Sequence, residues 1–226
     1  NLSIGFKEEG YLPETMINFL SLLGWSPGNN DEMFTLEQLC QEFSVKRVGK
    51  AGTRFDIEKA KWFNQQYLKA KPNEELAIYL LNDLSERNIE CSSEKAALIC
   101  GMLKERVVFP TEFIEEALFF FQAPQSYDEK TVKKKWSILA VDILTEFKSK
   151  VTEIEDFTSK EAKQLLIEIV NSKEGKLGAV MPTLRVALTG MGSGPDLLEI
   201  MDLFGAAEIS ERIAIAIEAL SERVKS

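Results

Sequence analysis

The chain contains no histidine among its 226 residues, and this absence excludes several kinds of catalytic site. Ser/His/Asp and Cys/His nucleophilic sites both need an imidazole as the general base. Zinc sites are built mainly from cysteine and histidine, and Cys40, Cys91 and Cys100 lack zinc-ligand spacing, so we expect no metal site. Three widely separated cysteines are also typical of a reducing compartment, which favours a cytoplasmic protein.

Other familiar signals are missing as well. No apolar run reaches the roughly 18–20 residues that span a bilayer, so no membrane partner is expected. The sequence has no basic leader followed by an apolar core, and no glycine-rich phosphate loop. The acidic group Glu153, Glu155 and Asp156 is most simply a polar linker rather than a catalytic pair. These absences predict a chain that performs no chemistry by itself.

Positive charge is scarce, because 36 acidic residues face 27 lysines and arginines and give a net charge of −9. This balance argues against a simple nucleic-acid-binding protein, whose domain is usually basic. The basic residues are nevertheless grouped, and local groups can contact phosphates in an acidic protein. One group comprises Lys46, Arg47, Lys50, Arg54, Lys59 and Lys61, and a second comprises Lys130, Lys133, Lys134 and Lys135. For Lys133, Lys134 and Lys135 an ordinary solvated helix surface is the favoured interpretation.

Apolar residues recur at helical spacing almost throughout, which predicts an all-α protein of several multi-helix modules. Pro13 suits a first helical turn, Thr35 and Asp56 are expected N-caps, and Gly24 is expected to end its helix in a left-handed conformation. Gly190 and Gly205 mark later stops, while Pro195 and Ser210 mark later starts. Helices are expected at about residues 13–24, 36–43, 57–69, 74–88, 93–105, 110–121, 128–149, 159–172, 178–190, 194–204 and 208–224. Joints near residues 71 and 125 divide the chain into modules 1–70, 71–125 and 126–226.

The aromatic residues could be imagined as base-stacking platforms, but their helical spacing favours the core. This prediction covers Trp25, Trp62, Trp136 and the run from Phe119 to Phe121. The helix after Asp56 is expected to bury Ile57, Trp62 and Tyr67.

Several segments are distinctive sequence motifs. They are Gly10-Tyr-Leu-Pro-Glu14, Asn18-Phe-Leu-Ser-Leu-Leu-Gly-Trp25, Lys59-Ala-Lys-Trp-Phe-Asn64 and Pro182-Thr-Leu-Arg-Val-Ala-Leu-Thr-Gly190, followed by Pro195 and Gly205. In order and spacing the chain resembles the part of bacterial glutamyl-tRNA synthetases that follows their KMSKS loop, with a native polypeptide that begins far upstream. The ATP signatures of this family, HIGH and KMSKS, are absent here.

This resemblance implies that different modules bind different parts of a tRNA. Residues 1–70 would contact the inner side of the tRNA L, and the two later modules would bind the anticodon. The partners implied are tRNA for glutamate and a catalytic domain of the same polypeptide, which would use ATP and magnesium, in a monomeric enzyme. The chain itself would need no cofactor.

The resemblance also implies particular site residues. Arg106, in Leu103-Lys-Glu-Arg-Val, would read the third anticodon base with its planar guanidinium, and the alternative is a cation at a helix C-terminus. Arg185, with Thr189, Gly190, Ser193 and Pro195, would form a polar corner for a base or a phosphate. The alternative is a glycine-terminated helix with a proline-started successor.

The first basic group would supply contacts to the tRNA backbone, from Lys46, Arg47, Lys50, Arg54 and Lys61, and the alternative is a solvated loop. The competing function, from a different class, is an acidic all-helical scaffold that binds proteins and no RNA.

Overall fold

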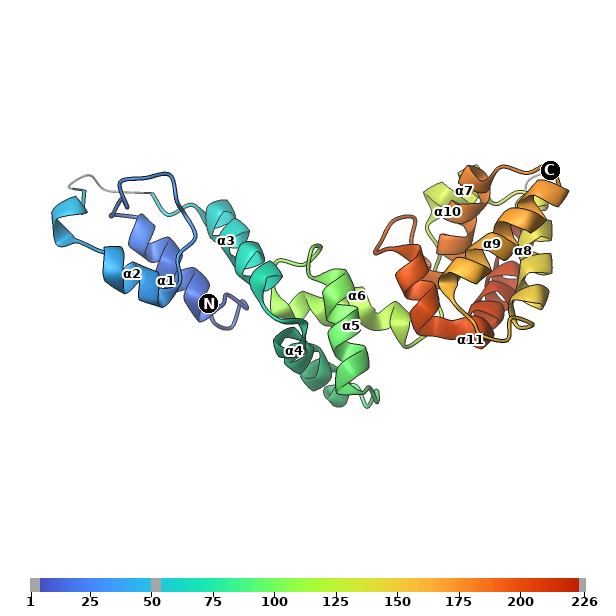
Figure 1. The fold of residues 1–226 in the computed structure, drawn as a ribbon, viewed down its shortest axis with the longest axis horizontal. Coiled ribbons are helices and arrows are strands. Elements are labelled where there is room, and N and C mark those ends of the chain that lie inside the picture. The colour runs from blue at the N-terminus through green and yellow to red at the C-terminus, as the bar shows by residue number, and fades with distance from the viewer. Residues whose placement is uncertain (1–4, 50–53, 224–226) are drawn as a thin grey trace. The chain divides into compact units, whose positions relative to one another are not determined.

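A computed structural model describes residues 5–49 and 54–223 of the chain (Figure 1). Within these ranges the regular structure consists of eleven α-helices, four short 3₁₀ helices and an isolated β-bridge between Trp25 and Val48. The all-α prediction is confirmed. The chain forms two compact units, Asn1–Glu116 and Ala117–Ser226, which are described separately below. The division into modules at residues 70 and 125 stays a prediction.

The first unit begins with α1 (Pro13–Leu22), α2 (Leu36–Glu42) and α3 (Ile57–Ala70). Thr35 forms a capping box with Gln38, and the Asp56 carboxylate accepts the first free N–H groups of α3, as predicted. Gly24 does not adopt the predicted left-handed conformation. The chain leaves α1 through right-handed Leu23, and the N–H of Trp25 still bonds to the carbonyl of Ser21 at 3.1 Å, so no reversal is required.

The buried face of α3 differs from the predicted one. Its buried residues are Ala60, Phe63, Asn64 and Leu68, which follow the i, i+3, i+4 spacing of a single helical stripe. Trp62 lies outside this stripe and is 42% exposed, whereas Ile57 is in register with it but is the first residue of the helix and is 40% exposed. The prediction that Trp62 belongs to the core is therefore wrong, because its position on the helix turns the side chain away from the buried stripe.

The remainder of the first unit is an antiparallel pair, α4 (Asn73–Glu86) and α5 (Ser93–Leu103), followed by the short α6 (Phe113–Ala117). Asn64 of α3 ties this part to the start of α1 and is fully buried. Its Oδ1 accepts from the N–H of Leu12 at 2.8 Å and the hydroxyl of Thr15 at 2.9 Å, while its Nδ2 donates to the carbonyl of Val108 at 2.6 Å. One amide thus satisfies polar groups from two distant segments.

The second unit packs α7 (Glu129–Lys135), α8 (Ile138–Val151), α9 (Ser159–Ser172), α10 (Leu177–Thr189) and α11 (Leu197–Ala219) around one apolar core. The 3₁₀ helix Leu118–Phe120 precedes them. Phe119, Phe120 and Trp136 are buried as predicted, as is Trp25 in the first unit.

Two predicted helix boundaries in this unit need correction. The single helix expected at 128–149 is broken at Trp136, whose ψ of 85° leaves the helical region while its side chain is only 1% exposed. The hydroxyl of Ser137 then caps α8 by accepting the N–H of Ala140 at 3.2 Å. The predicted stop at Gly205 is confirmed, because its φ of 72° and ψ of 172° break the helical backbone within α11. Ser210 lies inside α11 and starts no helix, and its hydroxyl donates instead to the carbonyl of Lys148 at 3.0 Å.

Candidate nucleic-acid interface

Gly190 ends α10 as predicted, and it does so in a left-handed conformation with φ of 75°. Its N–H bonds to the carbonyl of Val186 at 2.8 Å, which closes the last turn of the helix. A Cβ atom at this position would lie 2.6 Å from the carbonyl oxygen of Ser126, so the position has room only for glycine. Both the turn and the close approach of another segment therefore depend on this residue.

Residues 189–195, called the corner below, connect α10 to α11. Side chains of α10 hold the corner in place. Thr189 is buried, and its hydroxyl donates to the carbonyl of Arg185 at 2.8 Å and accepts the N–H of Met191 at 3.1 Å. The Nη1 of Arg185 crosses the corner and donates to the carbonyl of Pro195 at 2.8 Å. The structure thus brings Arg185, Thr189, Gly190 and Pro195 together, and Ser193 lies exposed between them.

The corner is seated against the first turn of α7. The N–H of Asp128 donates to the carbonyl of Gly190 at 2.8 Å. A Cβ atom on Gly192 would lie 2.6 Å from Oγ1 of Thr131 and 2.8 Å from Oδ1 of Asp128. The two segments are therefore in direct contact, and a small residue at 192 is required for it.

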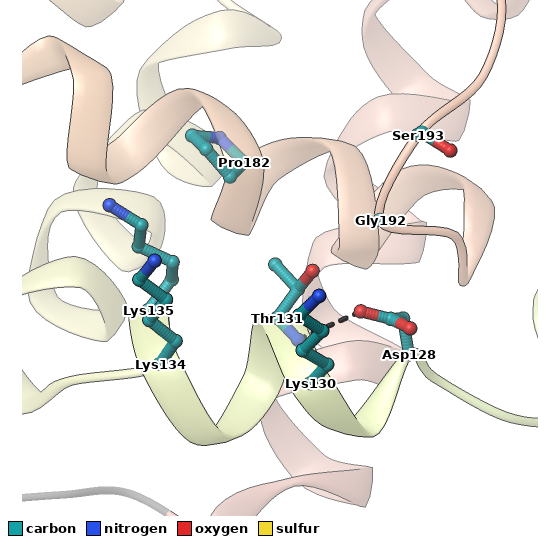
Figure 2. Close-up of a pocket in the computed structure, with 8 residues that line it drawn as sticks. All are labelled: Asp128, Lys130, Thr131, Lys134, Lys135, Pro182, Gly192 and Ser193. Atoms are coloured by element: carbon teal, nitrogen blue, oxygen red, sulfur yellow. Dashed lines mark hydrogen bonds between the residues drawn. The ribbon is translucent and has the colours of Figure 1, made fainter.

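A groove with a volume of about 410 Å³ lies between the corner and α7. In Figure 2, α7 supplies the lysines along one side, while Pro182, Gly192 and Ser193 lie on the other. The residues that line the groove are Asp128, Lys130, Thr131, Lys134, Lys135, Pro182, Gly192 and Ser193.

The groove is basic even though the whole chain is acidic. Three ammonium groups, from Lys130, Lys134 and Lys135, face one carboxylate, that of Asp128. Hydrogen bonds from the hydroxyl and the N–H of Thr131 lower the pKa of Asp128, so this carboxylate stays ionised as the N-cap of α7. Lys133 does not line the groove and pairs with Glu129 at 3.2 Å.

The second basic group of the sequence is thus divided by the fold. Lys130 and Lys134 are exposed, as expected of an ordinary helix surface, and together with Lys135 they line a groove beside the corner, whereas Lys133 lies outside it. A signal for this was present, because Lys130 and Lys134 are spaced i, i+4, as are Thr131 and Lys135, and such pairs share a helix face. The sequence does not show that the corner lies opposite that face, because tertiary packing brings the two segments together.

Arg106, the other predicted base reader, lies in the first unit. It is exposed in the turn that follows α5, and its Nε is 3.9 Å from Oε2 of Glu116. Its role stays a prediction.

Arg47, in the first basic group, is engaged in the local fold. Its guanidinium donates to the carbonyls of Pro27 and, at 2.7 Å, of Glu42, and it lies 5.5 Å from the ring centre of Trp25. These contacts hold the loop after Trp25 against the turn that follows α2.

The other members of that group differ in their environment. Lys61 pairs with Glu58 at 2.9 Å, and this hydrogen bond raises the pKa of the lysine. Lys46 and Arg54 are exposed, and Lys50 lies outside the described residues. Contacts from these residues to a tRNA backbone stay a prediction.

Two further features are absent from the described residues. In residues 5–49 and 54–223, no three histidine, cysteine or acidic side chains are grouped so that they could hold a metal ion. Over the same ranges, no helix has the length and apolar character needed to cross a membrane.

Comparison with known proteins gives the chain a family. Residues 57–217 match the family model described as "Anticodon binding domain", and residues 3–62 match "tRNA synthetases class I (E and Q), catalytic domain". The curated glutamate–tRNA ligase of Amoebophilus asiaticus is 43% identical over 216 residues, covering 96% of this chain and 42% of that protein. The corresponding ligase of Cytophaga hutchinsonii is 41% identical, covering 99% and 43%. This chain therefore spans less than half the length of these relatives.

Solved structures agree with the sequence comparison. The crystal structure of a glutamate tRNA ligase from Elizabethkingia meningosepticum, in complex with its amino acid, matches 97% of this chain and 44% of its own, with a TM-score of 0.90 and 41% identity. The glutamate–tRNA synthetase of Elizabethkingia anophelis matches 96% and 43%, with a TM-score of 0.84 and 41% identity. The chain thus belongs to the anticodon-binding-domain family and is a homologue of the glutamate–tRNA ligases.

Proposed function

We propose that this chain is the tRNA-binding portion of a glutamate–tRNA ligase and that its second unit binds the anticodon. The observation that carries the proposal is the corner itself, where Arg185 is held by its bond to Pro195 beside a basic groove. A guanidinium is a planar group with five N–H donors, which suits a base edge or a phosphate. Its position is set by the fold, so little ordering is needed when RNA binds.

The residues proposed to contact tRNA fall into two sets. The anticodon set is Arg106, Arg185, Thr189, Gly190, Ser193 and Pro195. The backbone set is Lys46, Arg47, Lys50, Arg54 and Lys61. Thr189, Gly190 and Pro195 are buried, so their proposed contribution is the shape of the corner and the placement of Arg185.

The remaining parts of the proposal concern the whole enzyme. Glutamate activation with ATP and magnesium, and transfer to tRNA, would take place in a catalytic domain of the same polypeptide, in the cytoplasm and as a monomer. Over the described residues the side chains form no metal-binding group, and the sequence has no histidine for a HIGH signature. We therefore expect no ATP–pyrophosphate exchange from this chain alone, and clear exchange would contradict this part of the proposal.

The test is a titration of the chain with tRNA for glutamate and with a tRNA of unrelated anticodon, each at two salt concentrations. We expect tighter binding of the first and weaker binding of both at higher salt. Arg185→Ala should weaken binding of tRNA for glutamate by about 1–3 kcal/mol if it reads a base. Lys160→Ala, which removes an exposed charge at the start of α9, is the control and should change little. Failure of a folded wild-type chain to bind either tRNA would favour the competing scaffold function.

A further inference from the structure

We propose that the groove between α7 and the corner holds the ribose–phosphate backbone of RNA, independently of sequence, with Lys130, Lys134 and Lys135 as the phosphate ligands. The inference rests on the proposed function and adds a second activity to the same unit. Arg185 would discriminate among bases at the corner, while the groove lysines would grip the adjacent chain without reading it.

Over residues 5–49 and 54–223, the three groove lysines form no ion pair of their own. Among the described residues, none of the three lysines has an acidic partner within 4.0 Å, although the chain carries 36 acidic residues. Lys130 and Lys134 stand four residues apart on α7, and like charges at this spacing oppose helix formation. An anion bound between the two ammonium groups would relieve this repulsion.

The chemistry of the lining favours a phosphate over a base. None of the eight residues that line the groove is aromatic, so a base would find no ring on which to stack. All three cations are lysines, whose ammonium groups act as point charges on flexible stems and lack the planar fork that reads base edges. Contacts from such groups position a nucleic acid and carry no sequence information.

The wall opposite the lysines belongs to the corner, which makes the groove continuous with the proposed base-reading residues. Gly192 and Ser193 line the groove, and Arg185 bonds to Pro195 two residues beyond Ser193. Asp128, the lone carboxylate in the lining, is already engaged by Thr131 as the cap of α7. The hydroxyl of Ser193 is exposed and has the chemistry to bond to a phosphate oxygen or a ribose hydroxyl.

Helix α7 offers a matched control for this proposal. Lys133 lies on the same seven-residue helix, carries the same charge and pairs with Glu129 away from the groove. The comparison is therefore between the double variant Lys130→Ala/Lys134→Ala and the single variant Lys133→Ala, each checked for native helicity by circular dichroism.

Binding of tRNA for glutamate and of a tRNA with an unrelated anticodon would be measured over a series of salt concentrations. For the double variant we expect both affinities to fall by the same factor. The slope of log K against log salt should become shallower by about 1.4, or about 0.7 for each lysine that contacts a single-stranded phosphate. Lys133→Ala should leave both affinities and the slope at their wild-type values.

Two outcomes would overturn the proposal while the proposed function survives. A double variant that matches Lys133→Ala in slope and affinity would mean that the groove contacts no phosphate. A loss confined to tRNA for glutamate would mean that the groove reads bases. If the folded wild-type chain binds no tRNA at any salt concentration, both the proposed function and this inference fail, and that result is recognised before any variant is compared.

Discussion

The guanidinium of Arg212 and the main-chain carbonyl of Leu188 lie 2.9 Å apart, although Arg212 is on α11 and Leu188 is in the last turn of α10. The same nitrogen donates to the carbonyl of Phe119 at 2.7 Å, and the Nε bonds to Glu208 at 2.6 Å. Carbonyls in a last helical turn lack a partner within the helix. A buried arginine from elsewhere in the unit therefore caps α10 immediately before the corner.

Replacing Arg212 with methionine should lower the free energy of unfolding. Methionine keeps much of the side-chain length, but the buried carbonyls of Leu188 and Phe119 lose their donor. Each unpaired buried acceptor costs about 1–3 kcal/mol. Urea denaturation followed by circular dichroism measures the change. Arg223→Met is the control, because Arg223 is exposed and should shift stability by less than about 0.5 kcal/mol. Equal effects of the two substitutions would show that the buried contacts of Arg212 contribute nothing.

Gly190→Ala should destabilise the second unit and weaken tRNA binding together. The left-handed backbone costs an L-residue about 1–3 kcal/mol, and the added methyl would press on the carbonyl of Ser126. Gly178→Ala is the matched control, since a Cβ atom there meets nothing within 4 Å and its φ is not in the left-handed region. Thermal unfolding and tRNA titration of both variants make the comparison. A Gly190→Ala protein as stable as the control would refute the steric argument.

Cys100 should be inert while the protein is folded, because burial raises the pKa of its thiol to about 12. The thiolate is the reactive form, so a thiol reagent at pH 8 should label exposed Cys40 quickly and Cys100 only after unfolding. Cys40→Ser should remove the fast phase. Rapid labelling of Cys100 in the folded protein would contradict its burial.

The same shift predicts how stability changes at high pH. An unfolded cysteine ionises near pH 9.0, whereas folded Cys100 keeps its proton up to about pH 12. Between these values the unfolded state binds fewer protons, so stability falls as pH rises. Cys100→Ala should flatten this part of the profile in urea titrations at pH 8 to 11. An unchanged slope would assign the alkaline loss of stability to other groups.

Asn64→Leu should destabilise the first unit, although leucine is similar in size to asparagine. The substitution leaves the N–H of Leu12 without an acceptor and the carbonyl of Val108 without a donor, at about 1–3 kcal/mol each. Gln66→Leu, on a more exposed position of α3, serves as the control. The difference between the urea midpoints of the two variants reports how much the buried amide of Asn64 contributes to stability. Similar midpoints would show that its hydrogen bonds contribute little.

Local chemistry explains which parts of the fold were predictable. Thr35, Asp56 and Gly190 act through bonds to residues near them in sequence, and all three were predicted correctly. The break at Trp136 was missed because it depends on burial of the indole ring among helices distant in sequence. The helical spacing of the aromatic residues predicts Trp62 in the core, whereas the register of Ala60, Phe63 and Asn64 turns it outward.

The candidate site was predictable to a similar extent. The polar corner could be predicted from the sequence motif around Arg185, because the residues of the corner are close together in the sequence. The groove could not be predicted, because it exists only where residues 128–135 meet residues 182–193. Contacts of this kind depend on tertiary packing that periodicity does not encode.

The break at Trp136 gives α7 an independence that a continuous helix would lack. Its seven residues are anchored at one end by the bond from Asp128 to Gly190 and at the other by the buried indole. The charges between these anchors can therefore be exchanged without altering α8 or the apolar core. For protein engineering, α7 is therefore a segment in which lysines can be added or removed to test how strongly the unit holds RNA under the proposed function, while Arg185 stays in place.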